Sequence, residues 1–433
     1  MKNQYLVLVL FLFFFGCKSN LKLVKNRPAK VAIVNSNGKY TLLVNNEPFY
    51  IKGAGLSYGD ISKLAKNNAN SFRTWTTNNG VKSGKEVLDE AYENGLMVAM
   101  GINLAKERHG FDYNNKLAVK KQYEGIKKEV LELKDHPALL LWVIGNELNL
   151  KYTNIVMWDE LNNISKMIHK IDPNHLTTTT LAGISQKEVT LIQEKCTDLD
   201  ILSIQMYGNL ENLPQLIKKF DWKGPYIVSE WGATGHWQVP KTKWGAPIEE
   251  NSSVKASKYL KRYNYGIKKD TLQCLGSYVF LWGQKQERTP TWYGMFTEDG
   301  IETESVDVMH YIWNNQWPKN RAPKVISFTL NEKTAYQNSI LKKGAINRAT
   351  ILIEDFENDS ISYRWEILPE SKNIKPGGYR EKKPNALIIE CVSQENNQLV
   401  FKSPDSKGEY RLFVYGNDNH GHMATANIPF KVQ

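Results

Sequence analysis

The sequence contains few cysteines. Apart from Cys17 near the start of the chain, only Cys196, Cys274 and Cys391 occur in 433 residues. They are too few and too scattered for a disulfide framework or a cysteine-based zinc site, so we expect these three to be buried as small hydrophobic residues. No glycine-rich phosphate turn follows the first predicted strand, which argues against a nucleotide cofactor. We therefore expect no metal and no cofactor.

Long hydrophobic runs are also scarce. The first residues, MKNQYLVLVLFLFFFGCKSN, hold an apolar run of about a dozen residues, which suits a signal peptide and is short for a membrane-spanning helix. The segment FFFGC resembles the lipobox of bacterial lipoproteins, in which cleavage before the cysteine leaves a thiol that carries lipid. This resemblance implies a signal peptide over residues 1–16, lipid attachment at Cys17, and a basic tether over 17–30. An ordinary signal peptide with an incidental cysteine is the alternative.

The lipobox resemblance also implies a location. No Asp follows Cys17, which points to the outer membrane of a bacterial cell envelope, and no acidic run follows that would indicate surface display. We therefore expect the protein to associate with a membrane through an N-terminal lipid anchor.

Acidic residues are in deficit. There are 56 Lys and Arg against 45 Asp and Glu, and the formal net charge is +11. The basic residues lie along helical segments such as KKQYEGIKKEVLELK, interleaved with Glu or aromatic residues. This spacing is typical of solvated helix faces, so we expect no nucleic-acid partner. A basic surface still favours anionic membranes or glycans.

From residue 49 to 317, short apolar runs alternate with longer amphipathic segments. The predicted strands are FYIKGAGL, SFRTWTT, LMVAMGINL, LLLWVIGNEL, HLTTTTLA, DILSIQMYG, PYIVSEWG and LGSYVFLWG. Eight such units over roughly 270 residues predict an α/β fold, a (β/α)8 barrel (TIM barrel). A doubly wound sheet is the competing architecture, but the missing phosphate turn disfavours it.

Two smaller units flank the predicted barrel. Residues 31–48 read as short β-hairpins that plug or edge the barrel floor. Residues 321–433 show strand patterns separated by polar turns, with a Trp in an early strand, and predict an all-β immunoglobulin-like sandwich. The acidic turn EDFENDS in this unit lacks the alternating Asp of a calcium loop, so we interpret it as a solvated turn. We expect the sandwich to brace the barrel.

Two glutamates end predicted strands. In a (β/α)8 barrel the active site forms at the carboxyl ends of the strands. Glu147 ends the fourth strand and Glu230 ends the seventh, which faces it across the barrel mouth. Retaining glycosidases need such a pair of carboxylates about 5 to 5.5 Å apart. A pair of structural salt bridges at the barrel top is the alternative reading.

The motifs around these glutamates resemble a known group of enzymes. WVIGNE and IVSEWG, with an Asn directly before the first Glu, are similar to the signature of the retaining glycoside hydrolases of clan A. This resemblance implies that Glu147 is the acid/base, Glu230 the nucleophile and Asn146 the donor to the sugar 2-hydroxyl. It also implies that Arg73 and Tyr207 contact Glu230, and that Trp282 floors the subsite where cleavage occurs.

Aromatic residues crowd the loops predicted at the barrel mouth. Stacking of a sugar face on an aromatic ring is a usual basis of carbohydrate binding, so Trp75 and Trp231 are expected to contact substrate. His109 and His236 lie in loops after the third and seventh strands and are further candidates. Ordinary packing of the aromatic residues and solvation of the histidines are the alternatives.

The expected activity is hydrolysis of β-glycosidic bonds in a polysaccharide or oligosaccharide. A barrel followed directly by one immunoglobulin-like domain is similar to bacterial endo-β-1,3-glucanases that act on laminarin, which makes a β-1,3-glucan the first expectation. HPALLLWVIGNE also resembles the large exo-acting enzymes of the same clan, which carry further domains ahead of the barrel. An exo-acting β-glycosidase is therefore one alternative, and a non-catalytic glycan-binding lipoprotein is another.

Overall fold

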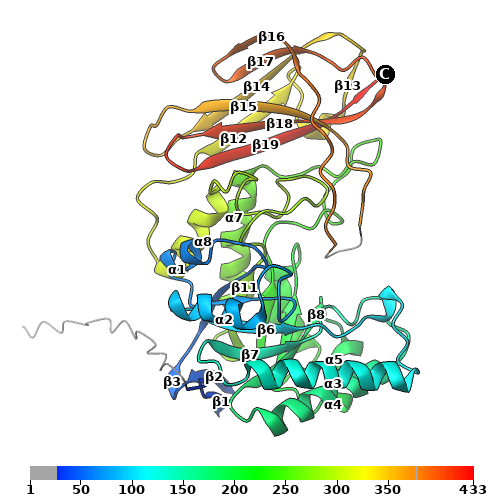
Figure 1. The fold of residues 1–433 in the computed structure, drawn as a ribbon. Coiled ribbons are helices and arrows are strands. Elements are labelled where there is room, and N and C mark those ends of the chain that lie inside the picture. The colour runs from blue at the N-terminus through cyan, green and yellow to red at the C-terminus, as the bar shows by residue number, and fades with distance from the viewer. Residues whose placement is uncertain (1–26, 376–378) are drawn as a thin grey trace, which may run out of the picture.

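The protein is described by a computed structural model that covers residues 27–375 and 379–433. A closed parallel barrel forms one part of the molecule and two mainly antiparallel sheets form the other, as Figure 1 shows; β13 (Ser339–Leu341) pairs in parallel, with β19 (Met423–Val432). The predicted signal peptide and Cys17 lie outside the described residues.

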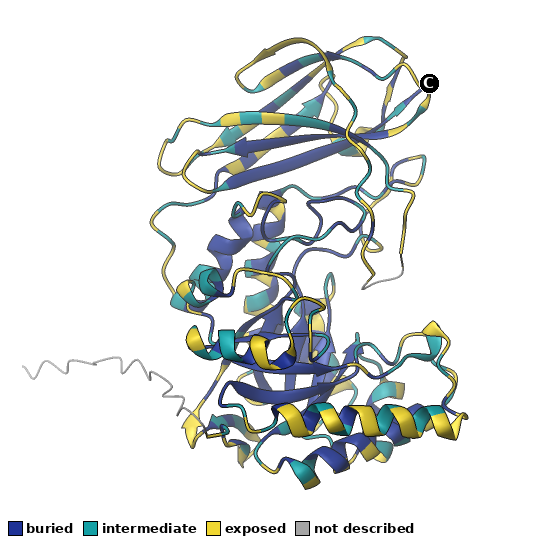
Figure 2. Ribbon diagram, viewed as in Figure 1, coloured by how far each residue is buried: buried dark blue, intermediate teal, exposed yellow. Residues whose placement is uncertain are grey.

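Eight parallel strands form the barrel, which confirms the (β/α)8 prediction. Their order around it is β10-β11-β4-β5-β6-β7-β8-β9, so the chain runs once around the barrel and closes where β11 pairs with β4. The strands are β4 (Ile51–Gly55), β5 (Ser71–Arg73), β6 (Met97–Ile102), β7 (Leu139–Ile144), β8 (Leu176–Ala182), β9 (Ile201–Gln205), β10 (Tyr226–Glu230) and β11 (Cys274–Val279). Their residues are almost all buried, because helices cover the outside and side chains fill the inside (Figure 2).

Helices follow the strands and lie around the barrel. They are α1 (Ile61–Lys66), α2 (Gly84–Glu93), α3 (Lys116–Leu133), α4 (Val156–Ile171), α5 (Gln186–Lys195), α6 (Leu213–Lys219), α7 (Ser252–Arg262) and α8 (Glu304–Asn314). Side chains that accept from backbone N–H groups set several of their starts: Asp60 caps α1, Ser83 forms a capping box on α2, and Asn251 caps α7. Helix α3 buries only one side and exposes the Lys-rich remainder (Figure 2).

A three-stranded antiparallel sheet lies under the barrel. Strands β1 (Val31–Ser36), β2 (Lys39–Val44) and β3 (Glu47–Pro48) form it. Val31 and Leu42 pack with Ile51, Met97 and other residues from the first halves of barrel strands. The sheet therefore closes the amino-terminal end of the barrel and leaves the carboxyl ends of the strands as the mouth.

The C-terminal unit is a sandwich of two four-stranded sheets. One has the order β12-β14-β17-β16 and the other β13-β19-β18-β15. The strands are β12 (Lys324–Leu330), β13 (Ser339–Leu341), β14 (Ile346–Glu354), β15 (Ser362–Pro369), β16 (Glu390–Glu395), β17 (Gln398–Lys402), β18 (Gly408–Asn417) and β19 (Met423–Val432). Side chains such as Leu330, Ile351, Phe401, Leu412 and Phe430 fill the space between the sheets.

A buried polar network joins the sandwich to the barrel. The Glu249 carboxylate, just before α7, accepts hydrogen bonds from Lys255 at 2.5 Å, Thr289 at 2.6 Å, Thr291 at 2.8 Å and Asn427 of β19 at 2.7 Å. Burial by itself raises the pKa of Glu249, but the charges of Lys255 and Arg411, together with the hydrogen bonds from Lys255 and Thr289, hold that pKa below its ordinary value. Both units thus supply partners to one buried charge.

Some expectations about single elements were wrong or incomplete. Cys196 and Cys274 are buried as expected, but Cys391 is exposed at an edge strand, β16. Helices α5, α6 and α8 and strands β13 and β17 did not stand out in the sequence. Across residues 27–375 and 379–433, each helix is either too short or too polar to cross a membrane.

Candidate active site

Glu147 follows a sharp turn at the end of β7. Gly145 and Glu147 both have left-handed backbone conformations, with φ of 73° and 53°. Glycine adopts this region freely, but a glutamate there is under backbone strain. The Glu147 amide donates to the Thr180 carbonyl and hydroxyl, each at 3.1 Å, which fixes the turn against β8. The apolar strand therefore ends in a turn that holds one carboxylate at the barrel mouth.

Glu230 ends β10 and accepts four hydrogen bonds. Its Oε1 accepts from Arg73 Nη1 at 2.8 Å, Trp75 Nε1 at 2.7 Å and Gln205 Nε2 at 2.9 Å. Its Oε2 accepts from the Tyr207 hydroxyl at 3.0 Å. The side chains of Arg73 and Glu230 are 1% and 8% exposed, so this ion pair is shielded from water. Such donors stabilise a carboxylate in its charged form.

Asn146 lies between the two glutamates in the hydrogen-bond network. Its Oδ1 accepts from Arg73 Nη2 at 2.5 Å, Gln205 Nε2 at 2.7 Å and the Thr180 hydroxyl at 3.2 Å. Arg73 and Gln205 each contact both Asn146 and Glu230. One shared set of donors therefore fixes the amide and the carboxylate relative to each other.

The surroundings of Glu147 differ from those of Glu230. Burial is the main cause that raises the pKa of Glu147 to about 7, and the negative charge of Glu230 adds to it. The charges of Arg108, Lys106 and Arg73 act in the opposite direction. Arg108 Nη2 lies 3.8 Å from Glu147 Oε2, and its Nη1 donates to the Glu147 carbonyl. Near neutral pH, Glu147 therefore carries a proton for part of the time.

The aromatic residues divide into two groups. Trp75 binds Glu230 through its indole N–H, and Tyr207 packs edge-on against Trp237, whose side chain is largely exposed at the rim. Trp231 and Trp282 have no exposed surface. The assignment of both to substrate contact is therefore wrong in this structure: Trp231 packs against Tyr259, and Trp282 packs between Phe296 and Trp313.

Phe280 takes the position that the sequence reading gave to Trp282. Its ring makes edge-on contacts with Trp75 and Tyr207, at centroid distances of 5.8 and 6.1 Å. Both of these residues bind Glu230. Phe280 thus lies beside the side chains that bind Glu230, and Tyr293, also after β11, packs against both Phe280 and Tyr207.

The two candidate histidines have separate surroundings. His109 is exposed on the loop between β6 and α3, and its Nδ1 lies 3.1 Å from the hydroxyl of Tyr379. His236 lies 3.6 Å from Glu287 and packs against Trp237. Neither forms a hydrogen bond with Glu147 or Glu230 among those found in the described part of the chain.

Sequence reasoning missed four residues near the carboxylates: Gln205, Phe280, Lys106 and Arg108. Gln205 ends β9, just as Glu230 ends β10 and Glu147 follows β7. The rule that active-site residues lie at the carboxyl ends of barrel strands therefore applies to Gln205 as well. Lys106 and Arg108 lie in a loop, where no periodicity marks a side chain. Burial and the neighbouring charge of Arg108 lower the pKa of Lys106 to about 8.

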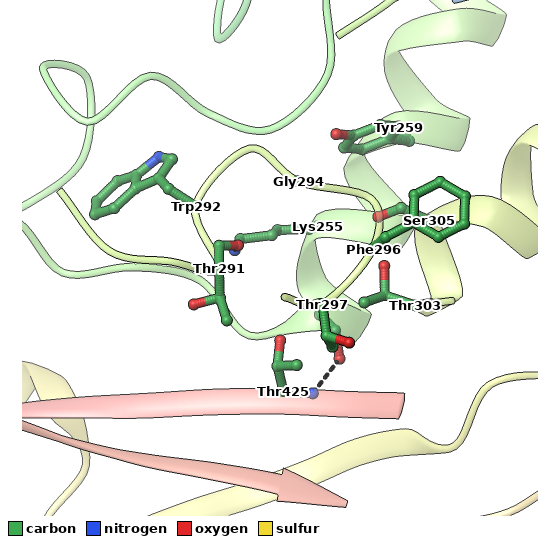
Figure 3. A pocket seen from close by; sticks show the side chains of 11 residues that line it. Lys255, Tyr259, Thr291, Trp292, Gly294, Phe296, Thr297, Thr303, Ser305 and Thr425 are labelled. Carbon is green, nitrogen blue, oxygen red and sulfur yellow. Dashed lines mark hydrogen bonds between the residues drawn. The ribbon is translucent and has the colours of Figure 1, made fainter. Parts of the chain in front are cut away.

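Two features away from the carboxylates concern other parts of the chain. A small cavity between the barrel and β19 is lined by polar residues such as Lys255, Thr291 and Thr425 and by aromatic residues such as Trp292 and Phe296 (Figure 3). The Thr425 amide donates to the Ser252 hydroxyl beside it at 3.0 Å. In the sandwich, carboxylate oxygens of Asp355, Asp359 and Asp418 lie within 4.8 Å of one another. The Asp418 carboxylate accepts hydrogen bonds from the backbone amides of His420 and His422, which hold the turn at residues 418–422.

One protein-family model matches part of the barrel. Residues 37–242 match the family model described as "Glycosyl hydrolases family 2, TIM barrel domain", a range that includes both Glu147 and Glu230. No curated protein sequence matches the chain.

Two solved structures share the fold. One is the Bifidobacterium dentium β-glucuronidase complexed with coumarin-3-O-glucuronide, with a TM-score of 0.50, 19% identity and coverage of 65% of this chain. The other is the FMN-binding β-glucuronidase from Facaelibacterium prausnitzii L2-6, with a TM-score of 0.50, 14% identity and coverage of 93%. This chain spans only 49% and 59% of the lengths of those proteins. These comparisons show that the chain has a TIM-barrel fold, and that residues 37–242 are similar to the TIM-barrel domain of family 2 glycosyl hydrolases.

Proposed function

We propose that the protein is a retaining glycoside hydrolase that cleaves β-glycosidic bonds by double displacement. The observation that carries this proposal is the contrast between the two carboxylates. Glu230 accepts four hydrogen bonds, one of them from the charged Arg73, which suits a charged nucleophile. Burial and a like charge raise the pKa of Glu147, which suits a proton donor.

In the first step, Oε2 of Glu230 attacks the anomeric carbon. Oε1 already accepts three hydrogen bonds, whereas Oε2 accepts one, from Tyr207. The bond from the carbon to the leaving oxygen breaks, its electron pair remains on that oxygen, and Glu147 transfers its proton there. A covalent glycosyl ester with Glu230 results.

In the second step, the deprotonated Glu147 removes a proton from water. The water oxygen attacks the anomeric carbon, the ester bond breaks, and its electron pair returns to Glu230. Two inversions leave the configuration of the sugar unchanged. Asn146 contributes through its Nδ2 group to the sugar 2-hydroxyl, since Arg73, Gln205 and Thr180 already hold its Oδ1.

A β-1,3-glucan of the laminarin type is the substrate that we propose to test first. Exposed aromatic rings around the mouth, including Tyr58 and Trp237, favour a glycan of several units. An oligosaccharide ladder from laminarin supports endo action, whereas single monosaccharides released from chain ends favour the exo alternative. We further propose that the C-terminal sandwich is an immunoglobulin-like domain, and that Cys17 anchors the protein to the outer membrane.

Substitution of each glutamate tests the assignment of roles. Glu230→Ala removes the nucleophile and abolishes turnover, and azide then restores activity with inverted stereochemistry. Glu147→Ala lowers cleavage of natural glycans by about 10²- to 10⁴-fold and spares substrates with good leaving groups, because an activated aryl oxygen needs no proton. Azide rescue of Glu147→Ala gives a product of retained configuration. The reverse pattern contradicts the role assignment, and near wild-type activity in both variants contradicts the glycosidase.

A further inference from the structure

A long connection of the sandwich reaches the barrel. It joins β15 to β16, and in Figure 1 its orange part descends from the sandwich toward the barrel. The amide of Arg288, in the loop after β11, donates to Glu381 at 2.7 Å, and the Glu381 residue is only 3% exposed. Lys383 lies 2.7 Å from Glu298 and 3.0 Å from Glu366. The contacts of Glu381 with Arg288 and of Lys383 with Glu298 hold the connection to the loop after β11, whereas Glu366 belongs to β15 of the sandwich.

Tyr379 of the same connection lies against another barrel loop. Its hydroxyl lies 3.1 Å from Nδ1 of His109, and the two rings are 5.1 Å apart between centroids. The next residue back, Arg108, binds the Glu147 carbonyl and lies within electrostatic reach of both Glu147 and Tyr379. Two neighbouring residues of one barrel loop, His109 and Arg108, thus link Tyr379 of the sandwich to Glu147 of the barrel.

Under the proposed function, Tyr379 lies on the side of the site where the leaving group departs. The acid/base protonates the leaving oxygen, so the departing sugar lies on the Glu147 side of the site. Arg108, His109 and Tyr379 lie on this side. The same side carries a groove between the β6–α3 and β7–α4 loops, lined by Glu107, Phe111, Lys151 and Asn154 among others.

We infer that Tyr379 forms part of the subsite for the leaving-group sugar, so that the C-terminal sandwich takes part in substrate recognition. This inference rests on the proposed glycosidase function and extends it. Tyr379 is 46% exposed, which leaves ring surface available to a sugar face. Tyr379 is not needed to hold the connection to the barrel, because Glu381 and Lys383 already do so.

The test compares two kinds of substrate in the full-length protein. One kind is the β-glucosyl, β-galactosyl, β-mannosyl and β-glucuronyl fluorides, whose leaving group has no ring. The other is the disaccharides with the same non-reducing sugars, whose leaving group is a sugar. The readout is the kcat/KM for the disaccharide divided by the kcat/KM for the matching fluoride.

We expect Tyr379→Ala to lower this ratio by roughly five- to tenfold, the range that loss of one aromatic contact gives. Tyr379→Phe keeps the ring and is expected to retain most of the ratio. Tyr336→Ala, at another exposed tyrosine of the sandwich, is the matched control and leaves the ratio unchanged. If Tyr379→Ala does not fold, Tyr379→Leu replaces the flat ring with an apolar chain of similar reach.

The possible outcomes separate the two proposals. If the parent protein cleaves none of the four fluorides, no disaccharide and no laminarin, the glycosidase proposal fails and the subsite fails with it. If the parent cleaves a fluoride and its disaccharide but the ratio in Tyr379→Ala matches that of Tyr336→Ala, the subsite alone is wrong. An unchanged ratio together with a lowered melting temperature shows that Tyr379 only tethers the sandwich.

Discussion

Arg73 binds Glu230 through one guanidinium nitrogen, with Nη1 and Oε1 2.8 Å apart. The other terminal nitrogen of Arg73 binds Asn146, so one planar group sets the spacing between the proposed nucleophile and the amide expected to contact the sugar. Arginine can do this because its nitrogens form a rigid fork, whereas the single ammonium of lysine cannot reach both partners in the same geometry.

We therefore expect Arg73→Lys to keep the charge and lose the fork. Each hydrogen bond to a charged group contributes about 1.5–3 kcal/mol, so kcat/KM should fall by roughly 10- to 100-fold. Steady-state kinetics on a cleaved β-glycoside measures the effect, and the melting temperature reports whether the fold is intact. A variant with parental kcat/KM would show that the positive charge alone matters.

The pH dependence should follow Glu147. Burial raises the pKa of this acid to about 7, and the acid must be protonated for the first step, so kcat/KM should fall as the pH rises above that value. Arg108 lowers this pKa, so Arg108→Met should move the alkaline limb to higher pH. Lys85→Met, at an exposed residue of α2, is the control and should leave the limb in place. A shift of the limb to lower pH in Arg108→Met would contradict the assignment of Glu147.

The Lys255–Glu249 pair should contribute to stability. The two side chains are 7% and 1% exposed, and loss of one partner from such a pair costs about 3 kcal/mol. Lys255→Met should therefore lower the free energy of unfolding by about that amount, measured by denaturant titration. The neighbouring Lys258–Glu250 pair is more exposed, so Lys258→Met should cost less than about 1 kcal/mol. Equal effects of the two substitutions would argue against the buried network.

This contribution should depend on pH. The folded-state pKa of Glu249 lies below its ordinary value, so its stabilising effect is fully present above the unfolded-state pKa and is lost as the pH falls through the folded-state pKa. The difference in stability between the parent and Lys255→Met should thus shrink toward acid pH.

Deletion of the chain after about residue 320 removes Asn427 from the network, and soluble, active truncated protein would contradict a bracing role for the sandwich.

Attachment can be tested apart from catalysis. If Cys17 carries lipid, Cys17→Ser should release the protein from the membrane fraction and leave hydrolysis unchanged, because the residue precedes the barrel. Fractionation of cells that express the parent and the variant measures this. Unchanged association with membranes would refute lipidation at Cys17.

The barrel and the positions of the two glutamates were predictable because they depend on local patterns. Apolar runs mark the strands, and Glu147 and Glu230 come where such runs end. The aromatic residue after β11 was not predictable, because the direction of a side chain beyond a strand changes from one residue to the next. Phe280 faces Trp75 and Tyr207, while Trp282 packs against Trp313 of α8.

Contacts between distant segments left no signal in the sequence. Tyr379 and His109 are separated by 270 residues, and neither lies in a periodic segment. Helices α5 and α6 were missed because they are short and carry few buried residues, so their apolar spacing covers only two or three turns. The exposure of Cys391 depends on β16 being an edge strand, which is a property of the assembled sheet.

The sheet of β1, β2 and β3 leaves one end of the barrel open to a ligand. It closes the barrel at the end opposite the glutamates, and the described chain enters the molecule there (Figure 1). With the lipid anchor that we propose upstream, we expect the closed end to face the bilayer and the open end to face the surrounding medium. The proposed polymeric substrate would then reach the carboxylates without passing between the protein and its membrane, and the products would leave by the same side.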